Sequence, residues 1–233
     1  MLDDPVAYLD NACVTLKPQS VIDSIQDYYI NTPGCGGRSV HRYGTHVSKS
    51  ISQSRKKLAN FFSAPSVNEI VFTRNATHSL NQIAKGLEWN KGDVVLTTDR
   101  EHNSNLVPWL QLEQEQGIDH RVVRSNQDNT FNLESFEEAC AEAGTKLKMV
   151  SMSHVGNLDG VETPVKEITK IAKDYGALVS IDGAQSAPHM SVDVQDLGID
   201  FYSFSIHKML GPSGLGGLWA RTELLENMRT IQS

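Results

Sequence analysis

The stretches ALVSIDGAQ (177–185) and DFYSFSIHKMLGPSGLGGLWA (200–220) decide the fold class of this chain. Each begins with an apolar run of strand length and then turns polar. Asp182 and Gln185 follow the first run, and Lys208 follows the second. Polar residues directly after apolar strands gather at one edge of a parallel sheet, where α/β proteins bind their ligands.

Around these two runs, strand-like segments alternate with helix-like segments. Strands are predicted at 69–73, 93–98, 120–125, 147–154, 177–182, 200–205 and 216–221. Helices are predicted at 18–30, 45–62, 77–87, 105–116, 133–143 and 164–176. Several strands are apolar on both faces, as expected where helices cover both sides of a sheet. We therefore predict an α/β fold, a three-layer α/β/α sandwich with a mainly parallel mixed sheet.

Composition argues against several classes of protein and of binding partner. The formal net charge of −7 argues against a nucleic acid or an anionic membrane surface as partner. No apolar run reaches the roughly 18 residues that a membrane span needs, and MLDDPVAYLD (1–10) lacks the apolar core of a secretory signal. Cys13, Cys35 and Cys140 fit neither a disulfide framework nor a zinc cluster, so no metal site is predicted. We expect a protein of the reducing cytoplasm.

Lys208 and Asp182 together favour pyridoxal 5′-phosphate as a cofactor. A lysine amine forms a covalent bond with the aldehyde of this group, and a buried carboxylate keeps its pyridine nitrogen protonated. Enclosure lowers the pKa of the amine, so that the neutral form can attack. A solvated loop lysine and a helix N-cap aspartate are the ordinary alternatives. The spacing of both residues with Gln185 favours the cofactor.

The phosphate would be held by two other segments. A helix opens with Asn75, Ala76 and Thr77 directly after a predicted strand, and a helix N-terminus is a typical anion site. Thr77 could instead be an ordinary N-cap. Ser205 and His207 flank the end of the strand before Lys208 and would reach the same phosphate.

Two polar residues after other strands complete the predicted site. His102 follows the strand at 93–98, where its imidazole would lie over the cofactor ring and move protons at the substrate carbon. Asn157 follows the strand at 147–154, where its amide would bond to the ring hydroxyl. A hydrogen-bonded loop histidine is the ordinary alternative for His102. Lys208 and His102 are the predicted catalytic residues.

The order of these motifs resembles that of the cysteine desulfurases and selenocysteine lyases, in the class V aminotransferase group of fold-type I enzymes. The resemblance extends from YLDNACVTLKP (8–18) to the lysine segment. It implies pyridoxal 5′-phosphate as cofactor, cysteine as the amino-acid substrate, and Gln185 beside Asn157 at the ring hydroxyl. It also implies a homodimer and a sulfur-acceptor protein as partners.

The same resemblance implies a domain organisation. Residues 1–30 would pack on a small C-terminal domain, residues 31–233 would form the cofactor-binding large domain, and the small domain is absent from this chain. The family's persulfide cysteine and substrate-binding arginine lie in the missing region, and Cys35 is not expected to replace that cysteine. The chain departs from the family at Asn103, often a histidine, and at His78, often a glutamate.

Other functions stay open at this point. The pocket could serve a class V aminotransferase, epimerase or β-lyase that acts on another amino acid. The chain could also be a non-catalytic fragment that binds the cofactor or a partner chain without turnover.

Overall fold

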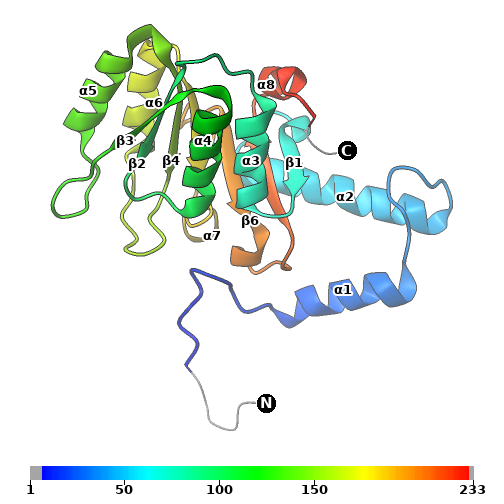
Figure 1. The fold of residues 1–233 in the computed structure, drawn as a ribbon. Coiled ribbons are helices and arrows are strands. Elements are labelled where there is room, and N and C mark those ends of the chain that lie inside the picture. The colour runs from blue at the N-terminus through cyan, green and yellow to red at the C-terminus, as the bar shows by residue number, and fades with distance from the viewer. Residues whose placement is uncertain (1–6, 231–233) are drawn as a thin grey trace.

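A computed structural model describes residues 7–230 (Figure 1). In this part of the chain, seven strands form one sheet in the order β1-β7-β6-β5-β4-β2-β3. Strand β7 runs antiparallel to β1 and β6, and the other neighbouring pairs are parallel. The strands are β1 (Ile70–Thr73), β2 (Val94–Thr98), β3 (Asp119–Val123), β4 (Leu147–Ser153), β5 (Leu178–Asp182), β6 (Phe201–Ser205) and β7 (Gly216–Ala220). All seven predicted strands are confirmed, with ends shifted by two residues or fewer.

The six predicted helices are also confirmed. The helices are α1 (Gln19–Asn31), α2 (Arg42–Phe61), α3 (Ala76–Gly86), α4 (Asn103–Gln116), α5 (Leu133–Ala143), α6 (Val165–Asp174), α7 (Ser186–His189) and α8 (Thr222–Asn227). Short 3₁₀ turns lie at Val67–Glu69, Gly144–Lys146 and Ile206–Lys208. Helix α7 was not predicted, because four residues are too few to show a helical period.

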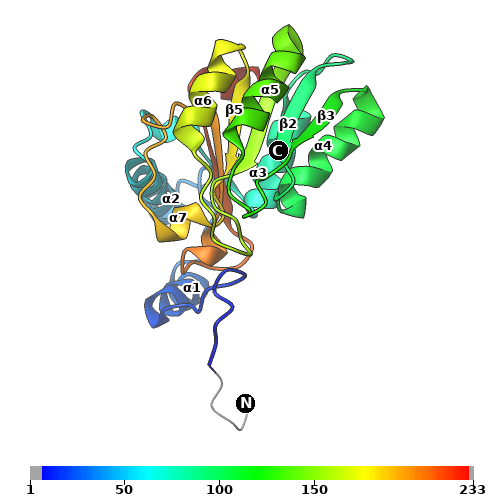
Figure 2. The same ribbon diagram turned by 90° about the vertical axis from the view of Figure 1, so that its left-hand side faces the viewer.

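Helices cover both faces of the sheet, which confirms the three-layer sandwich (Figure 2). On one face, Trp109 of α4 packs in a cluster with Met149 of β4. On the other face, Phe136 of α5 and Ile168 of α6 pack in a cluster with Val150 of β4. Neighbouring residues of β4 therefore enter different cores, which explains why this strand carries apolar side chains on both faces.

Capping residues fix where helices α3, α4 and α6 begin or end relative to the sheet. Helix α6 begins after Pro164 and is followed by Gly176, whose φ of +76° suits glycine. At the starts of α3 and α4, the side chains of Asn75 and His102 accept backbone N–H groups of the first turn. Both helices therefore begin at the edge where the strands before them end.

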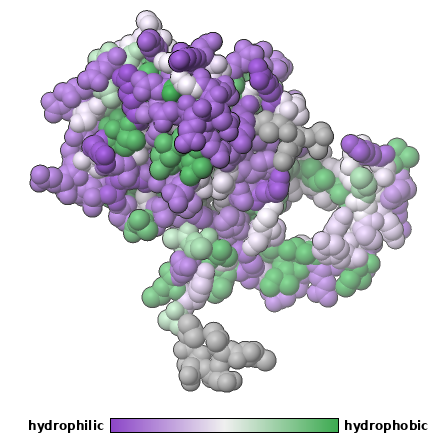
Figure 3. Space-filling view, viewed as in Figure 1, coloured by the Kyte–Doolittle hydropathy of each residue, from purple (hydrophilic) through white to green (hydrophobic). Residues whose placement is uncertain are grey.

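Helix α1 lies apart from the sandwich, whereas the segment before it contacts the edge where the strands end. Residues 7–17 run below the strand ends, and α1 leads away from the domain (Figure 1). No residue of α1 is buried. Among the described residues, both α1 and α2 expose apolar side chains, including Ile25, Tyr29 and Ile51, and Figure 3 shows apolar residues in green at the surface of this arm. Packing of segment 1–30 on a second domain stays a prediction, and residues 1–6 of it lie outside the described range.

Candidate active site

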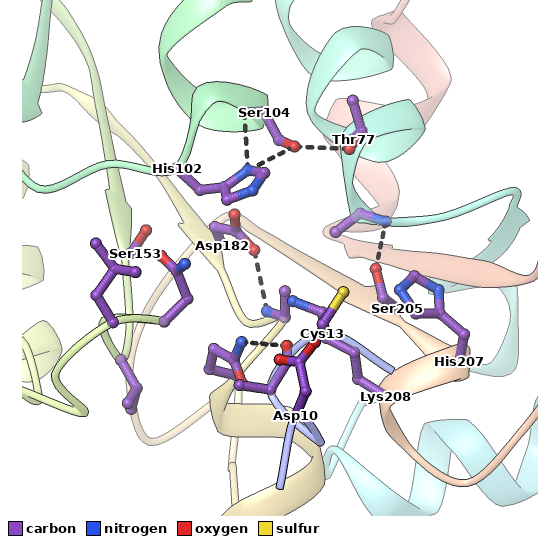
Figure 4. A pocket seen from close by; sticks show the side chains of 17 residues that line it. Asp10, Cys13, Thr77, His102, Ser104, Ser153, Asp182, Ser205, His207 and Lys208 are labelled. Atoms are coloured by element: carbon purple, nitrogen blue, oxygen red, sulfur yellow. Dashed lines mark hydrogen bonds between the residues drawn. The ribbon is translucent and has the colours of Figure 1, made fainter. Parts of the chain in front are cut away.

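A pocket of about 360 Å³ lies at the carboxyl ends of β4, β5 and β6 (Figure 4). The starts of α3 and α4 form one wall, and the N-terminal segment forms another. Parallel sheets bind ligands at this edge. Among residues 7–230, nine of the ten predicted site residues line it: Ala76, Thr77, His102, Asn157, Asp182, Gln185, Ser205, His207 and Lys208. Asn75 lies next to them as the N-cap of α3.

Lys208 ends the 3₁₀ turn that follows β6 and enters the pocket half-buried. Burial lowers the pKa of Lys208, and the charge of Asp182 opposes that decrease. The positive charge of Lys208 in turn lowers the pKa of His102 and His207, adding to the effect of their own burial. The pocket therefore favours a lysine with more of the neutral, nucleophilic form than a solvated lysine has.

Asp182 ends β5 with only 5% of its surface exposed. Burial raises the pKa of its carboxyl group, and a hydrogen bond from the Ala184 N–H and the charge of Lys208 lower it in part. The Ala184 bond reaches Oδ1 at 3.0 Å. A buried carboxylate is costly unless a charged donor partners it, so a cationic ligand group facing Asp182 would be stabilised.

The start of α3 is arranged as an anion site. The Ala76 N–H donates to Ser205 Oγ at 2.9 Å, which joins the start of α3 to the end of β6. The Asn75 side chain accepts the His78 N–H at 2.8 Å. Thr77 is exposed, and its Oγ1 lies 2.7 Å from Ser104 Oγ on α4. Ser205 keeps its own O–H proton for a ligand, because its bond to Ala76 uses only a lone pair.

His102 is both a pocket residue and the N-cap of α4. Its Nδ1 accepts the Ser104 N–H at 3.1 Å and lies 2.9 Å from Ser104 Oγ. A ring nitrogen that accepts an N–H carries no proton, so the neutral ring carries its proton on Nε2. Figure 4 shows the ring between Ser104 and Asp182. The neutral His102 is therefore a hydrogen-bond donor at Nε2.

Glu101, which sequence reasoning missed, fixes the turn in front of His102. Its carboxyl group accepts from Thr98 Oγ1 at 2.6 Å, Asn105 Nδ2 at 2.7 Å and Ser153 Oγ at 2.7 Å. Burial raises the pKa of Glu101, and these hydrogen bonds lower it in part. The position directly before a predicted site histidine was the available signal.

The amide residues take different places. Asn157 lines the pocket from the loop after β4. Gln185 lines it too, but its Nε2 donates to the Ala12 carbonyl at 2.8 Å. That amide therefore holds the N-terminal segment with one N–H, while its second N–H and its oxygen can still bond to a ligand.

The N-terminal segment supplies pocket residues that the sequence analysis did not assign. Asp10, Ala12 and Cys13 line the pocket together with Lys208. They lie far from the lysine along the chain, in the motif YLDNACVTLKP that carries the resemblance. That motif was the available signal, but its spacing says nothing of its place in the fold.

Comparison with known proteins identifies the family. Residues 7–233 match the family described as Aminotransferase class-V. The chain belongs to this class-V aminotransferase family. A probable cysteine desulfurase of Halalkalibacterium halodurans is 39% identical over 231 residues, which are 98% of this chain and 56% of the relative. A cysteine desulfurase of Serratia proteamaculans is 40% identical over 227 residues, covering 96% and 55%.

Solved structures agree with the family and the fold. The apo structure of a cysteine desulfurase from Thermococcus onnurineus superposes with a TM-score of 0.92 at 36% identity. The matched region is 98% of this chain and 56% of the Thermococcus onnurineus chain. A cystine C–S lyase in complex with its reaction product cysteine persulfide gives a TM-score of 0.85 at 27% identity, covering 96% and 59%. The class-V chain thus spans about half the length of the relatives it matches.

Metal-binding clusters and membrane-spanning helices are both missing from residues 7–230. No group of three or more His, Cys, Asp or Glu side chains within that range is arranged to hold a metal ion. None of the helices described there is long and apolar enough to cross a membrane.

Proposed function

We propose that this chain is the cofactor-binding part of a pyridoxal 5′-phosphate-dependent cysteine desulfurase-type enzyme, which removes sulfur from L-cysteine. The observation that carries the proposal is the meeting of Lys208 and Asp182 in one pocket beside the start of α3. The names of the relatives at 39% and 40% identity support the choice of cysteine as substrate.

The residues present fit this cofactor. A volume of about 360 Å³ is within the usual range for a small-molecule site. The phosphate would lie at the start of α3, held by Asn75, Ala76, Thr77, Ser205 and His207. At the other end, the carboxylate of Asp182 would receive the pyridinium N–H as its charged partner. Gln185 and Asn157 would face the ring hydroxyl.

Bound pyridoxal 5′-phosphate would supply an electron sink for the negative charge that develops at the substrate α-carbon. Lys208, with its lowered pKa, would bind the aldehyde and then take a proton from the α-carbon. His102 would lie over the ring and donate a hydrogen bond from Nε2 to the bound amino acid. Burial and the fixed turn at Glu101 would keep that imidazole neutral and oriented.

The purified protein with cofactor is expected to be yellow and to retain the cofactor covalently. Borohydride should trap the bond between cofactor and amine, and peptide mapping should then find the label on Lys208. Label on another lysine, or no label at saturating cofactor, would show that the proposed role of Lys208 is wrong.

A β-lyase is the second candidate, because the cystine C–S lyase superposes on this chain with a TM-score of 0.85. The products separate the two reactions in a full-length relative of this chain. Desulfuration of cysteine transfers its sulfur to an acceptor thiol as a persulfide and leaves alanine, whereas elimination across Cα–Cβ releases sulfide and leaves pyruvate and ammonia. Aminotransferase, epimerase and purely cofactor-binding roles stay alternatives that no contact in the pocket favours.

A homodimer is part of the proposal, with residues 38–43, where the glycine-rich loop passes into α2, near a cofactor site. The exposed apolar side chains of α1 and α2 support a covered surface in that region. A cytoplasmic location and a sulfur-acceptor partner also belong to the proposal.

Sedimentation of residues 1–233 is expected to show a dimer, and a methylene-blue assay is expected to show little sulfide release from cysteine. The low turnover follows because these residues match only 56% of the length of a relative. A monomer with brisk sulfide release would contradict both expectations.

A further inference from the structure

The N-terminal segment closes the turn that carries Lys208. Thr15 Oγ1 donates to the His207 carbonyl at 3.0 Å and accepts the Leu210 N–H at 3.0 Å. The Thr15 backbone N–H also donates to the His207 carbonyl, at 3.3 Å. A threonine hydroxyl has one proton to donate and lone pairs to accept. This single side chain, which is 7% exposed, therefore bridges the peptide groups on both sides of Lys208.

The bridged turn is tight and strained. Leu210 has a φ of +64°, a left-handed conformation that is unfavourable for a residue with a side chain. The N–H groups of Met209 and Gly211 both donate to the Ile206 carbonyl at 2.9 Å. Such a conformation persists only where its surroundings hold it. Thr15 provides that hold from outside the turn, because it binds the N–H of the strained residue.

Lys17 also hydrogen-bonds to the His207 carbonyl. Its Nζ donates to the His207 carbonyl at 2.7 Å and to the Thr15 carbonyl at 2.7 Å. The charge of Lys17 also contributes to the lowered pKa of His207. The segment is anchored a second time by Gln185, through the Ala12 carbonyl. It is thus tied to the segment after Asp182 and to the turn of Lys208.

We propose that Thr15 is a positioning residue for Lys208, whose hydroxyl holds the turn after β6 so that the lysine amine enters the pocket, with Lys17 as a second support. The inference deepens the proposed function and rests on it for the role of the amine. Nothing in the sequence between residues 15 and 208 indicates this pairing, because it is made by two segments that only the fold brings together.

The conformation of the turn also sets the pKa of the Lys208 amine in cofactor-free protein. Burial lowers the pKa of Lys208 in the native turn. If the turn relaxes, the amine becomes more solvated and its pKa rises toward the ordinary lysine value. The charged and titratable groups around the amine come from β5, α4, the N-terminal segment and the turn itself: Asp182, His102, Asp10, Cys13, Lys17 and His207.

The pH dependence of acetylation tests the inference in cofactor-free protein. Acetic anhydride would be applied across a pH series, with the modification of Lys208 followed by mass spectrometry and the exposed Lys57 as internal reference. In Thr15→Val, which keeps the shape but loses the hydroxyl, the midpoint for Lys208 should rise by about one pH unit, a tenfold change in proton affinity. Thr15→Ser, which restores a hydroxyl, should keep the wild-type midpoint.

Two further variants complete the test. Lys17→Met should give a smaller rise, because Thr15 remains, and the exposed Lys56→Met should give none. A folded Thr15→Val protein with the wild-type midpoint overturns the inference. If Thr15→Val does not fold by circular dichroism, Lys17→Met decides, and an unchanged midpoint there overturns it. Failure of the proposed function appears separately, as absence of a Lys208 label after borohydride treatment of the wild-type protein with cofactor.

Discussion

Lys208→Ala is expected to abolish covalent retention of pyridoxal 5′-phosphate and to raise the pKa of both imidazoles in the pocket. The first effect follows because the variant has no amine to bond the aldehyde. The second follows because the charge of Lys208 lowers the pKa of His102 and His207, so that its removal makes protonation of both rings easier. Gel filtration with absorbance would measure retention, and NMR titration of the ring protons would measure both pKa values.

The control is Lys57→Ala, which removes an exposed lysine of α2 far along the chain from the pocket. It should leave the yellow colour and both imidazole pKa values unchanged. Covalent cofactor in the Lys208→Ala protein would mean that another amine binds the aldehyde. Unchanged pKa values of His102 and His207 would mean that the amine does not lie beside them.

The fold could be predicted because its strands are apolar on both faces. In β4, for example, Met149 and Val150 enter opposite cores, so the strand between Leu147 and Ser153 carries apolar side chains on both faces. The ends were less certain, since β3 has one buried residue, Val123, and its neighbours are partly solvated. Exposed strand residues are often polar, so apolar patterning marks the ends of such a strand poorly. The predicted strand at 120–125 is therefore found at Asp119–Val123.

The site residues that directly follow strands could also be predicted. Asp182, Lys208 and His102 each come within a few residues of a strand end, and parallel strands end at one edge. Their positions after strands in the sequence were therefore enough to predict that the three side chains lie in one pocket. The chemistry of the set then suggested the cofactor.

The other half could not be predicted, because it depends on contacts between distant segments. Nothing local indicates that Thr15 bonds to the turn of Lys208, or that the amide of Gln185 holds the Ala12 carbonyl. The proton position on His102 is likewise set by the Ser104 N–H, which depends on where α4 begins. Such contacts follow from the packed fold and not from periodicity.

Asp182→Asn is expected to weaken cofactor chemistry much more than cofactor binding. The amide keeps the shape of the side chain, and the variant leaves the proposed phosphate-binding residues Ala76, Thr77 and Ser205 unchanged. It cannot stabilise a protonated pyridine nitrogen, so exchange of the α-proton of bound L-cysteine should slow about 100-fold, as for loss of one preorganised electrostatic partner. Exchange would be followed in deuterium oxide, and cofactor affinity by absorbance titration.

The same variant should change the cofactor-free protein in a defined direction. The charge of Asp182 raises the pKa of Lys208, so its removal should shift the acetylation midpoint of Lys208 to lower pH. Burial raises the pKa of Asp182 itself, so the folded state binds a proton more tightly than the unfolded chain. The carboxyl group therefore favours folding at low pH and loses that contribution as pH rises through its folded pKa. At neutral pH, the uncharged amide of the Asp182→Asn variant should leave the melting temperature equal to or above that of wild type.

Asp200→Asn provides the matched control, because Asp200 is a buried carboxylate of another kind. It is 2% exposed, pairs with Lys173 and Arg221, and accepts the Val179 N–H at 2.7 Å. Its replacement leaves the partly exposed cations Lys173 and Arg221 without their carboxylate. It should lower the free energy of unfolding by about 2 kcal/mol, with no change at Lys208. Replacing the paired carboxylate of Asp200 should thus destabilise the fold, whereas replacing the enclosed carboxylate of Asp182 should not. If Asp182→Asn instead destabilised the protein and lost cofactor in equal measure, Asp182 would be a structural residue like Asp200, and the cofactor orientation proposed for this pocket would be wrong.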